Sequence, residues 1–527
     1  MPTLARPDAA SMLIIGLGGG VALEGVPPHI SSVDVIELEP MVLAANQSIA
    51  PERGDDPLAD PRISVVLNDA RNALKLTQKT YDIIVSQPSH PWTGGAAHLY
   101  TVEFLQQAKS HLNPGGVFLQ WINSRFLDEE LLQTLMATLA DQFSFVELYQ
   151  PEREVLFFLA SDKPLEIWDG QQGAAMALRR YPRHYNRMGM RSPEDIIAML
   201  SLNDAAVRSF SADAPLNTDD HNLLAFYSLP GGKGLTSDDM QTLFLDMDPL
   251  TTENSDLHRN FGDRLALHHV AEQLLQGRFI QRTYQLARAA SLPDITATID
   301  ALGYDHSGET EKARAAFNEA LIRNPENGAA RAGLLRTYMG AFARGQLPPE
   351  VAALANQLRG PERRVLEGWV FGAAGAFGRL AALDAELAMV PPTSLFYPVS
   401  VKLRVDWRIL LAKQKEDPAP AVEALIILDD LLASYWNLDL YLLRAVAAQL
   451  AGNNIVFRES VAAASRQVRA RIALPDDSDL ALNPDEAKYL KGRLLEMRGL
   501  WPATLTVSSS DRAAVVMMEL NRTIEAL

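Results

Sequence analysis

The chain has 527 residues, of which 47% are hydrophobic and 21% charged, as in an ordinary globular protein of two or three domains. Its net charge of −17 argues against a nucleic-acid partner, because no basic surplus is available to neutralise phosphates. The lack of cysteine excludes disulfides and thiolate metal sites, and without an apolar leader or a run of about 18 apolar residues we expect a cytoplasmic protein with no membrane span.

Short apolar runs alternate with helical patterns over the first 160 residues. The predicted strands are 12–15, 33–36, 63–67, 81–86 and 117–121, followed by a hairpin of 143–149 and 155–160. Helices are predicted at 41–50, 70–76, 102–112 and 128–143. This alternation predicts a Rossmann-like α/β fold, with a parallel sheet covered on both faces and an antiparallel pair at its edge.

The rest of the chain is predicted to be mainly helical. Residues 167–226 show a helical pattern with a short final strand at 223–227, and the glycine-rich stretch 230–234 is typical of a linker. We predict a Rossmann domain of residues 1–235, a linker of 236–256 and an all-α domain of 257–527.

One window of the last domain has the spacing of a tetratricopeptide (TPR) repeat. The matching residues are Ala301, Tyr304, Gly308, Ala313, Phe317, Ala320 and Pro325. Tyr338 follows Tyr304 by the 34 residues of that repeat's period. This predicts a TPR-like array of helical hairpins, which would serve as a scaffold or oligomerisation domain, or would recognise a protein partner.

The most informative stretch joins the first two predicted strands. Gly16, Gly18 and Gly20 follow the first strand, and Glu37 closes the second. Glycines in this place let the backbone approach a ligand, and a carboxylate about 20 residues further on can accept both ribose hydroxyls. The spacing predicts a nucleoside site at one edge of the sheet.

Two further strand ends bring polar groups to the same edge. Asp69 follows the third strand, where it either accepts a hydrogen bond from an adenine amino group or caps the next helix. Gln87 and His90 follow the fourth strand, and His90 is either a titratable group of the site or a turn former. Trp92 in the same loop is more often a packing lid than a reactive group.

Metal binding is not expected. His268 and His269 form a pair without a neighbouring acid cluster. Asp219, Asp220 and His221 are adjacent in sequence, and adjacent residues rarely converge on one ion.

The order of the motifs resembles that of the spermidine synthase (polyamine aminopropyltransferase) family over about residues 12–230. The matching motifs are Ile15-Gly-Leu-Gly-Gly-Gly20, Val35-Ile-Glu37-Leu-Glu39, Asn68-Asp69-Ala70, Tyr81-Asp82-Ile-Ile-Val85, Leu99-Tyr-Thr-Val-Glu-Phe104 and Leu112-Asn-Pro-Gly-Gly-Val117. The Pro88–Trp92 loop and the Asn217–Asp220 stretch are similar to the type that bacteria often fuse to a transporter-like membrane region. A membrane tether would follow if this chain were part of such a longer protein.

This resemblance implies the Rossmann-like sheet of S-adenosylmethionine methyltransferases and the binding of a nucleoside ligand. The ligand would be decarboxylated S-adenosylmethionine or its product methylthioadenosine, with no metal. Gly16, Gly18, Gly20, Glu37, Asp69 and Ala70 would bind the nucleoside, Gln87 and His90 would take the catalytic positions, and Trp92 and Tyr100 would contact a polyamine or another acceptor.

The sequence departs from the family where the amine would bind. Gly19 and Gln87 stand in place of family aspartates, and His90 stands in place of a second acid. An amide cannot accept the amine's proton, so His90 is the candidate substitute base. Asp82, Glu103 and Asp219 are candidate sources of the missing negative charge.

Three functions therefore stay open. The first is an aminopropyltransferase-like enzyme. The second is an S-adenosylmethionine-dependent methyltransferase, which depends less on the missing carboxylates because methyl transfer can rest largely on positioning. The third is a non-catalytic nucleoside-binding module coupled to the TPR-like interaction domain.

Overall fold

The computed structural model describes residues 1–50, 56–88, 91, 95–165, 167, 173–188, 190–226, 234–251, 264–277, 279–338, 361–373, 375–390, 397–432, 438–473, 482, 484–502 and 512–527. The chain divides into two compact units. The first unit consists of Met1–Tyr185 and Met190–Ala330, and the second of Asn186–Gly189 and Arg331–Leu527. Only the first contains a sheet among the described residues.

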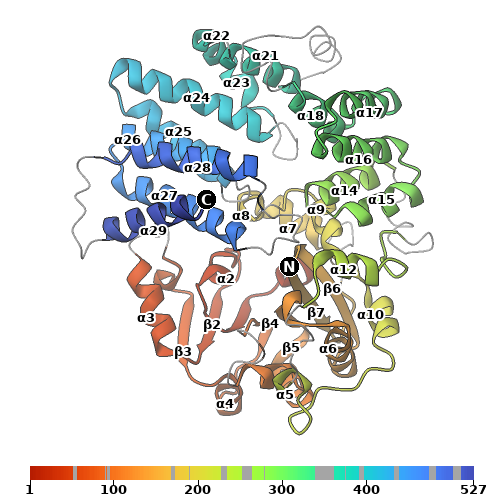
Figure 1. Ribbon diagram of the computed structural model, residues 1–527. Coiled ribbons are helices and arrows are strands. Elements are labelled where there is room, and N and C mark those ends of the chain that lie inside the picture. Colours follow the sequence, from red (N-terminus) through yellow and green to blue (C-terminus); the bar gives the residue numbers. More distant parts are fainter. Residues whose placement is uncertain are drawn as a thin grey trace. The chain divides into compact units, whose positions relative to one another are not determined.

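The described strands of the first unit form one eight-stranded sheet in the order β3-β2-β1-β4-β5-β7-β6-β8 (Figure 1). Its first five strands are parallel, and the other three extend it antiparallel. The strands are β1 (Ser11–Ile15), β2 (Ser32–Glu37), β3 (Ile63–Leu67), β4 (Tyr81–Ser86), β5 (Leu112–Asn123), β6 (Phe145–Glu152), β7 (Val155–Ser161) and β8 (Leu200–Leu202). The predicted Rossmann-like sheet with its antiparallel edge is confirmed.

Two details of the predicted elements are wrong. The segment 167–226, predicted as helical, contributes the edge strand β8. The strand predicted at 223–227 is instead the helix α11 (Leu223–Phe226). The side chain of Asn222 accepts a hydrogen bond from Ala225 N–H, and that of Asn217 accepts one from Leu223 N–H. These side chains stabilise a helical turn in preference to an extended strand.

Apolar side chains alternate along the strands and enter two hydrophobic clusters on opposite faces of the sheet. Leu13 and Ile15 belong to one cluster, and Met12 and Ile14 belong to the other. The first of these faces is covered by α4 (Ala70–Leu76), α5 (Val102–Ser110), α6 (Glu129–Gln142), α10 (Asp204–Phe210), α11 and α12 (Ser237–Leu243).

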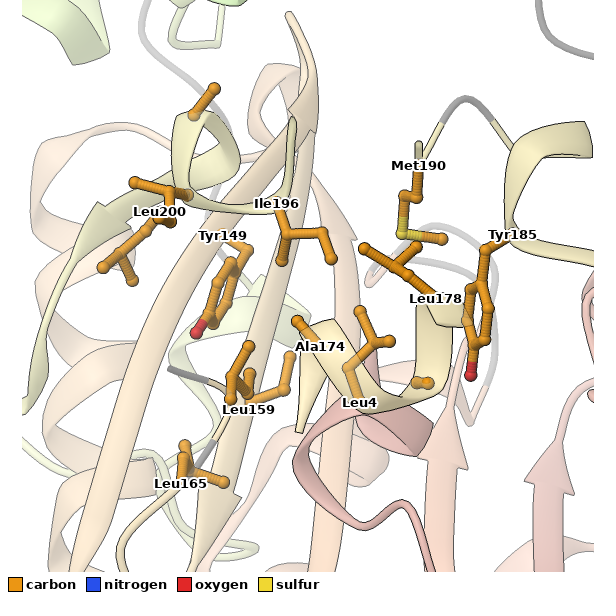
Figure 2. Packing of buried hydrophobic residues seen from close by; sticks show 14 of the residues in the cluster. Leu4, Tyr149, Leu159, Leu165, Ala174, Leu178, Tyr185, Met190, Ile196 and Leu200 are labelled. Atoms are coloured by element: carbon orange, nitrogen blue, oxygen red, sulfur yellow. The ribbon is translucent and has the colours of Figure 1, made fainter. Parts of the chain in front are cut away.

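The hydrophobic cluster on the opposite face joins residues of the sheet to helices from distant parts of the chain. Figure 2 shows Leu4, Leu178 and Ile196, from three of these helices, packed near Tyr149 and Leu159 of the sheet. The helices are α1 (Pro2–Ala5), α2 (Val21–Glu24), α3 (Pro40–Ile49), α7 (Ala174–Arg180), α9 (Pro193–Met199), α14 (Arg264–Gln276), α15 (Ile280–Ala289) and α16 (Pro293–His306). The short helix α8 (Pro182–Arg187) lies between α7 and α9 in the chain.

A buried ion pair fixes α15 to the sheet-containing part of the unit. The guanidinium of Arg282 pairs with Asp248, and each side chain is 6% exposed. Arg282 also donates to the carbonyl oxygen of Ala198 at 2.7 Å and to that of Leu200. By its contacts, α15 therefore belongs to the first unit, although it follows the linker predicted at 236–256. The domain boundaries 1–235 and 257–527 stay a prediction.

The described residues after the predicted linker are helical, which confirms the helical C-terminal region. In addition to α14–α16, the helices are α17 (Thr310–Arg323), α18 (Gly328–Arg336), α21 (Pro361–Ala373), α22 (Phe377–Ala382), α23 (Asp384–Leu387), α24 (Tyr397–Lys415), α25 (Ala419–Leu432), α26 (Leu438–Leu450), α27 (Asn454–Ile472), α28 (Pro484–Gly499) and α29 (Arg512–Ala526). Within the described ranges, no helix is both long and apolar enough to cross a membrane.

The predicted repeat window forms a helical hairpin. Ala301 of α16 and Ala313 and Phe317 of α17 are fully buried, and Gly308 lies between the helices at φ 76°. The small side chains allow close packing of the pair, and the glycine accommodates the turn. A TPR-like repeat over the rest of the region stays a prediction.

Candidate nucleoside site

A cavity of about 560 Å³ lies at the carboxyl ends of the parallel strands. Its volume is in the usual range for a small-molecule site. β1 pairs with β2 on one side and with β4 on the other, so the order of strands reverses there. Ligands of open α/β sheets bind at this reversal, where adjacent connections leave the sheet on opposite faces.

The glycine turn after β1 forms one wall of the cavity. Gly16, Gly18 and Gly20 have φ angles of 93°, 51° and 76°, which favour glycine. A Cβ atom on Gly16 would lie 2.8 Å from the carbonyl oxygen of Gln87. Gly19 differs, because its φ is not positive and a Cβ atom there would meet nothing within 4 Å. The backbone of the turn therefore favours glycine at positions 16, 18 and 20, whereas position 19 has room for a side chain.

Glu37 at the end of β2 lines the cavity beside this turn. Its Oε2 accepts a hydrogen bond from Leu17 N–H at 2.8 Å, and its Oε1 accepts one from Glu39 N–H at 2.9 Å. Only 8% of the residue's surface is exposed. The carboxylate is thus fixed by backbone groups, and each oxygen retains capacity for a second donor.

Asp69 and Ala70 line the cavity at the end of β3. Asp69 is the N-cap of α4, and its Oδ1 accepts a hydrogen bond from Asn72 N–H at 2.9 Å. The capping role weighed against adenine binding is therefore present. It does not exclude a ligand, because a carboxylate offers about four acceptor positions.

Gln87 links the fourth strand to the glycine turn. Its backbone N–H donates to Ile15 O at 3.0 Å, and its side-chain Nε2 donates to Gly16 O at 2.8 Å. The second bond requires a donor, which an ionised carboxylate lacks. Gln87 also lines the cavity. His90 and Trp92, predicted in the same loop, lie outside the described residues, and the catalytic roles of Gln87 and His90 stay predictions.

Tyr100 is placed differently from the expected acceptor contact. It is fully buried in the hydrophobic cluster below α5, and burial raises the pKa of its hydroxyl. Leu99, its neighbour in the short 3-10 helix η3 (Ala96–Tyr100), is among the described lining residues of the cavity, whereas Tyr100 is not. This position does not support acceptor binding by Tyr100, which stays a prediction.

Several cavity residues were not predicted from the sequence to contact a ligand. Leu38, Pro88 and Trp121 line it, as do Val21 and Leu99. Leu38 and Pro88 directly follow the predicted Glu37 and Gln87, so their place next to strand ends was the available signal. Trp121 lies near the end of β5, and no glycine or acid marks that position.

The three acids proposed to replace missing negative charge are used elsewhere. Asp82 lies at the opposite edge of the sheet, where it accepts hydrogen bonds from Ala10 and Ser11 N–H. Asp219 accepts two hydrogen bonds from Arg71, both at 2.6 Å, and these lower the pKa of its carboxyl to about 2. Glu103 accepts Asp219 N–H at 2.9 Å. None of these three described residues lines the cavity.

The weak metal candidates have other contacts. Nε2 of His268 lies 2.7 Å from Oδ2 of Asp294, an acid that is distant in the sequence, and Asn324 contacts both. In the part of the chain that the structure describes, no group of three His, Cys, Asp or Glu side chains is arranged to hold a metal ion.

The sheet order, the glycine turn and the fixed acid at the end of β2 together define a Rossmann-like domain of the type found in S-adenosylmethionine-dependent transferases. Residues 1–151 match the family model described as the spermine/spermidine synthase domain. This part of the chain is therefore a spermidine synthase-type domain.

Curated relatives agree with this assignment. The polyamine aminopropyltransferases of Escherichia fergusonii and Shigella boydii serotype 4 are each 32% identical over 152 residues, which are 28% of this chain and 52% of each relative. The chain thus spans about half the length of the curated relatives it matches. The crystal structure of spermidine synthase from Thermotoga maritima is 19% identical, with a TM-score of 0.27 and coverage of 44% of this chain and 69% of that one.

Proposed function

We propose that the first unit binds an adenosyl–sulfur nucleoside, of the decarboxylated S-adenosylmethionine or methylthioadenosine type, as an aminopropyl donor. The observation that supports this most is Glu37, a carboxylate fixed by two backbone N–H groups on the same cavity as the glycine turn and Asp69. The names of the curated relatives, polyamine aminopropyltransferases, support the same ligand class.

In this proposal the ribose hydroxyls donate to Glu37, and the adenine lies against Asp69 and Ala70. The sulfur end then extends from β2 towards β1 and β4, where Gly19 and Gln87 line the cavity. An acceptor's lone pair forms a bond to the aminopropyl carbon, and the carbon–sulfur bond breaks with its electron pair remaining on sulfur. Methylthioadenosine leaves, and the acceptor's proton passes to a base or to water. His90 is the proposed base.

Calorimetry with three nucleosides tests the binding step. We expect decarboxylated S-adenosylmethionine and methylthioadenosine to bind more tightly than S-adenosylmethionine. A preference for the carboxylated form would instead favour a methyltransferase. If none of the three bound, the proposed function would be wrong.

Turnover is a separate measurement. Protein incubated with decarboxylated S-adenosylmethionine and putrescine is assayed for methylthioadenosine by chromatography. Nucleoside binding without product from this or any other acceptor would identify a non-catalytic binding module. Where a rate is observed, His90→Ala should lower it, and an unchanged rate would exclude His90 as the base.

A further inference from the structure

Charge is distributed unevenly around the cavity. The carboxylates among its described lining residues are Glu37, Glu39 and Asp69, all at the ends of β2 and β3. The described residues of the wall opposite, at the ends of β1, β4 and β5, have no charged side chain. The stretch from Gln87 to Leu99 also contains no Asp or Glu in its sequence. The end of the cavity beyond the ribose acid is therefore free of carboxylates in its described wall.

The amide at Gln87 has a structural reason. Its Nε2 donates to Gly16 O at 2.8 Å, and this bond fixes the end of β4 to the glycine turn. A carboxylate in this position would place an acceptor against an acceptor. The local hydrogen bonding therefore favours a neutral side chain here.

The surroundings of Gly19 leave room for a side chain. A Cβ atom there would meet nothing within 4 Å, so the backbone would accept an aspartate, yet the chain has none at this place. Asp219, which approaches η3 from outside the cavity, is paired with Arg71 and lies 3.6 Å from His98. Asp219 is therefore not available to replace the carboxylate that is missing at position 19.

Such a wall is poorly suited to a polyamine. A diamine is a dication at neutral pH, and a buried ammonium is costly unless a carboxylate or several acceptors pair with it. Trp121 offers an aromatic ring in this wall, but one ring attracts a cation more weakly than a buried carboxylate does. The remaining contacts, from Pro88, Ala96 and Leu99, are apolar.

We propose that the acceptor of this site is an uncharged nucleophile with an apolar or aromatic body, rather than a polyamine cation. This rests on the proposed function, because it takes the sulfur end of the nucleoside to face Gly19 and Gln87. The neutral acceptor attacks with its own lone pair, the carbon–sulfur bond breaks with its electrons on sulfur, and the acceptor's proton passes to His90 or to water.

The test is a titration of the full-length protein with putrescine after saturation with methylthioadenosine, at low ionic strength. We expect no saturable putrescine binding to the wild type. Gly19→Asp places one carboxylate in the neutral wall and should make putrescine binding saturable, since hydrogen bonds to charged groups are the strong ones. Gly19→Asn introduces a side chain of the same size without the charge, and it should not bind putrescine better than the wild type does.

A second measurement tests directly whether the site prefers an apolar or aromatic acceptor. Phenol and putrescine are offered together to the nucleoside-loaded protein, and ligand-observed NMR should detect contact with phenol and not with putrescine. Saturable putrescine binding to the wild type would overturn the proposed acceptor class. So would putrescine binding by Gly19→Asn equal to that by Gly19→Asp, or the absence of phenol contact. Failure of the wild type to bind any of the three nucleosides would instead overturn the proposed function, and with it this inference.

Discussion

Glu37 accepts hydrogen bonds from Leu17 N–H and Glu39 N–H, which come from the turns after β1 and β2. The carboxylate is therefore held in one orientation by the backbone of two neighbouring turns. A group that is already oriented loses little conformational entropy on binding, so more of its hydrogen-bond energy is available to a ligand. This makes Glu37 the residue whose loss should affect the nucleoside most.

We predict that Glu37→Gln lowers nucleoside affinity by about 1.5–3 kcal/mol, or roughly 10- to 150-fold, because charge-assisted hydrogen bonds to ribose become neutral ones. Calorimetry with methylthioadenosine measures the change. Glu130→Gln, at an exposed acid in the first turn of α6, is the matched control and should bind as the wild type does. Equal affinities in both variants would contradict a ribose contact at Glu37.

The sequence predicts the cavity's glycines and acids better than its apolar wall. Gly16, Glu37 and Asp69 could be placed because the carboxyl ends of parallel strands meet at one edge. The predicted acceptor contact of Tyr100 is not supported by its buried position, since consecutive residues of a short 3-10 helix point in different directions. Leu99 lines the cavity while Tyr100 enters the core. Which of the two faces a ligand depends on packing that the local sequence does not reveal.

At the scale of elements, the segment at Asn217–Asp219 connects several walls of the site. The fully buried Asn217 donates from its backbone to Thr138 Oγ1 and from its side chain to Tyr100 O, and its carbonyl accepts Val102 N–H. Asp219 then pairs with Arg71, in the first turn of α4. The segment therefore joins η3 and the start of α5 to α4, whose first residue, Ala70, lines the cavity.

We predict that Asp219→Asn destabilises the protein by about 1–3 kcal/mol at pH 7, because Arg71 is left without its charged partner. The pKa of Asp219 is lowered from 3.8 to about 2 by hydrogen bonds from Arg71. The contribution of Asp219 to the free energy of unfolding is therefore complete above pH 3.8 and is lost as the pH falls towards 2. Denaturant unfolding between pH 7 and pH 2 should show the two stabilities converging in acid.

Asp220→Asn is the matched control for this loop, because Asp220 is adjacent and exposed. Its stability should follow that of the wild type at every pH. A constant difference between Asp219→Asn and the wild type down to pH 2 would show that the carboxylate charge is not the cause.

The main elements could be predicted from apolar periodicity, but β8 could not. It has only three residues, and its existence depends on pairing of Leu202 with Leu148 of β6. A strand that short carries too little alternation to be recognised without its partner. The pairing of β8 therefore had to come from the three-dimensional structure.

At the scale of the molecule, one hydrophobic cluster crosses the boundary predicted from the sequence. Leu250, Val270 and Leu286, which lie after residue 235, belong to the same cluster as Leu4 and Val35. The apolar faces of α14 and α15 could be recognised as buried faces. Their pattern does not say whether they cover another helix or a sheet, so the sequence placed them with the helical repeats.

We predict that a chain ending at Leu235 aggregates, because it leaves part of this cluster exposed to water. A chain ending at Arg336, which retains α14–α18, should stay monodisperse and unfold cooperatively. Size-exclusion chromatography and denaturant unfolding distinguish the two. Cooperative folding of the shorter chain would support the domain boundary predicted from the sequence.

The position of Arg282 has a consequence for how such a protein can diversify. Its guanidinium satisfies the carbonyl groups of Ala198 and Leu200, so a segment of the α/β core depends on a donor contributed by the helices that follow. A genetic exchange that replaced all helices following the sheet in the chain would remove the guanidinium that pairs with these carbonyl groups and with the buried carboxylate of Asp248. We expect recombination to be tolerated only where the crossover falls after α16, so that the first helices are inherited together with the nucleoside-binding domain.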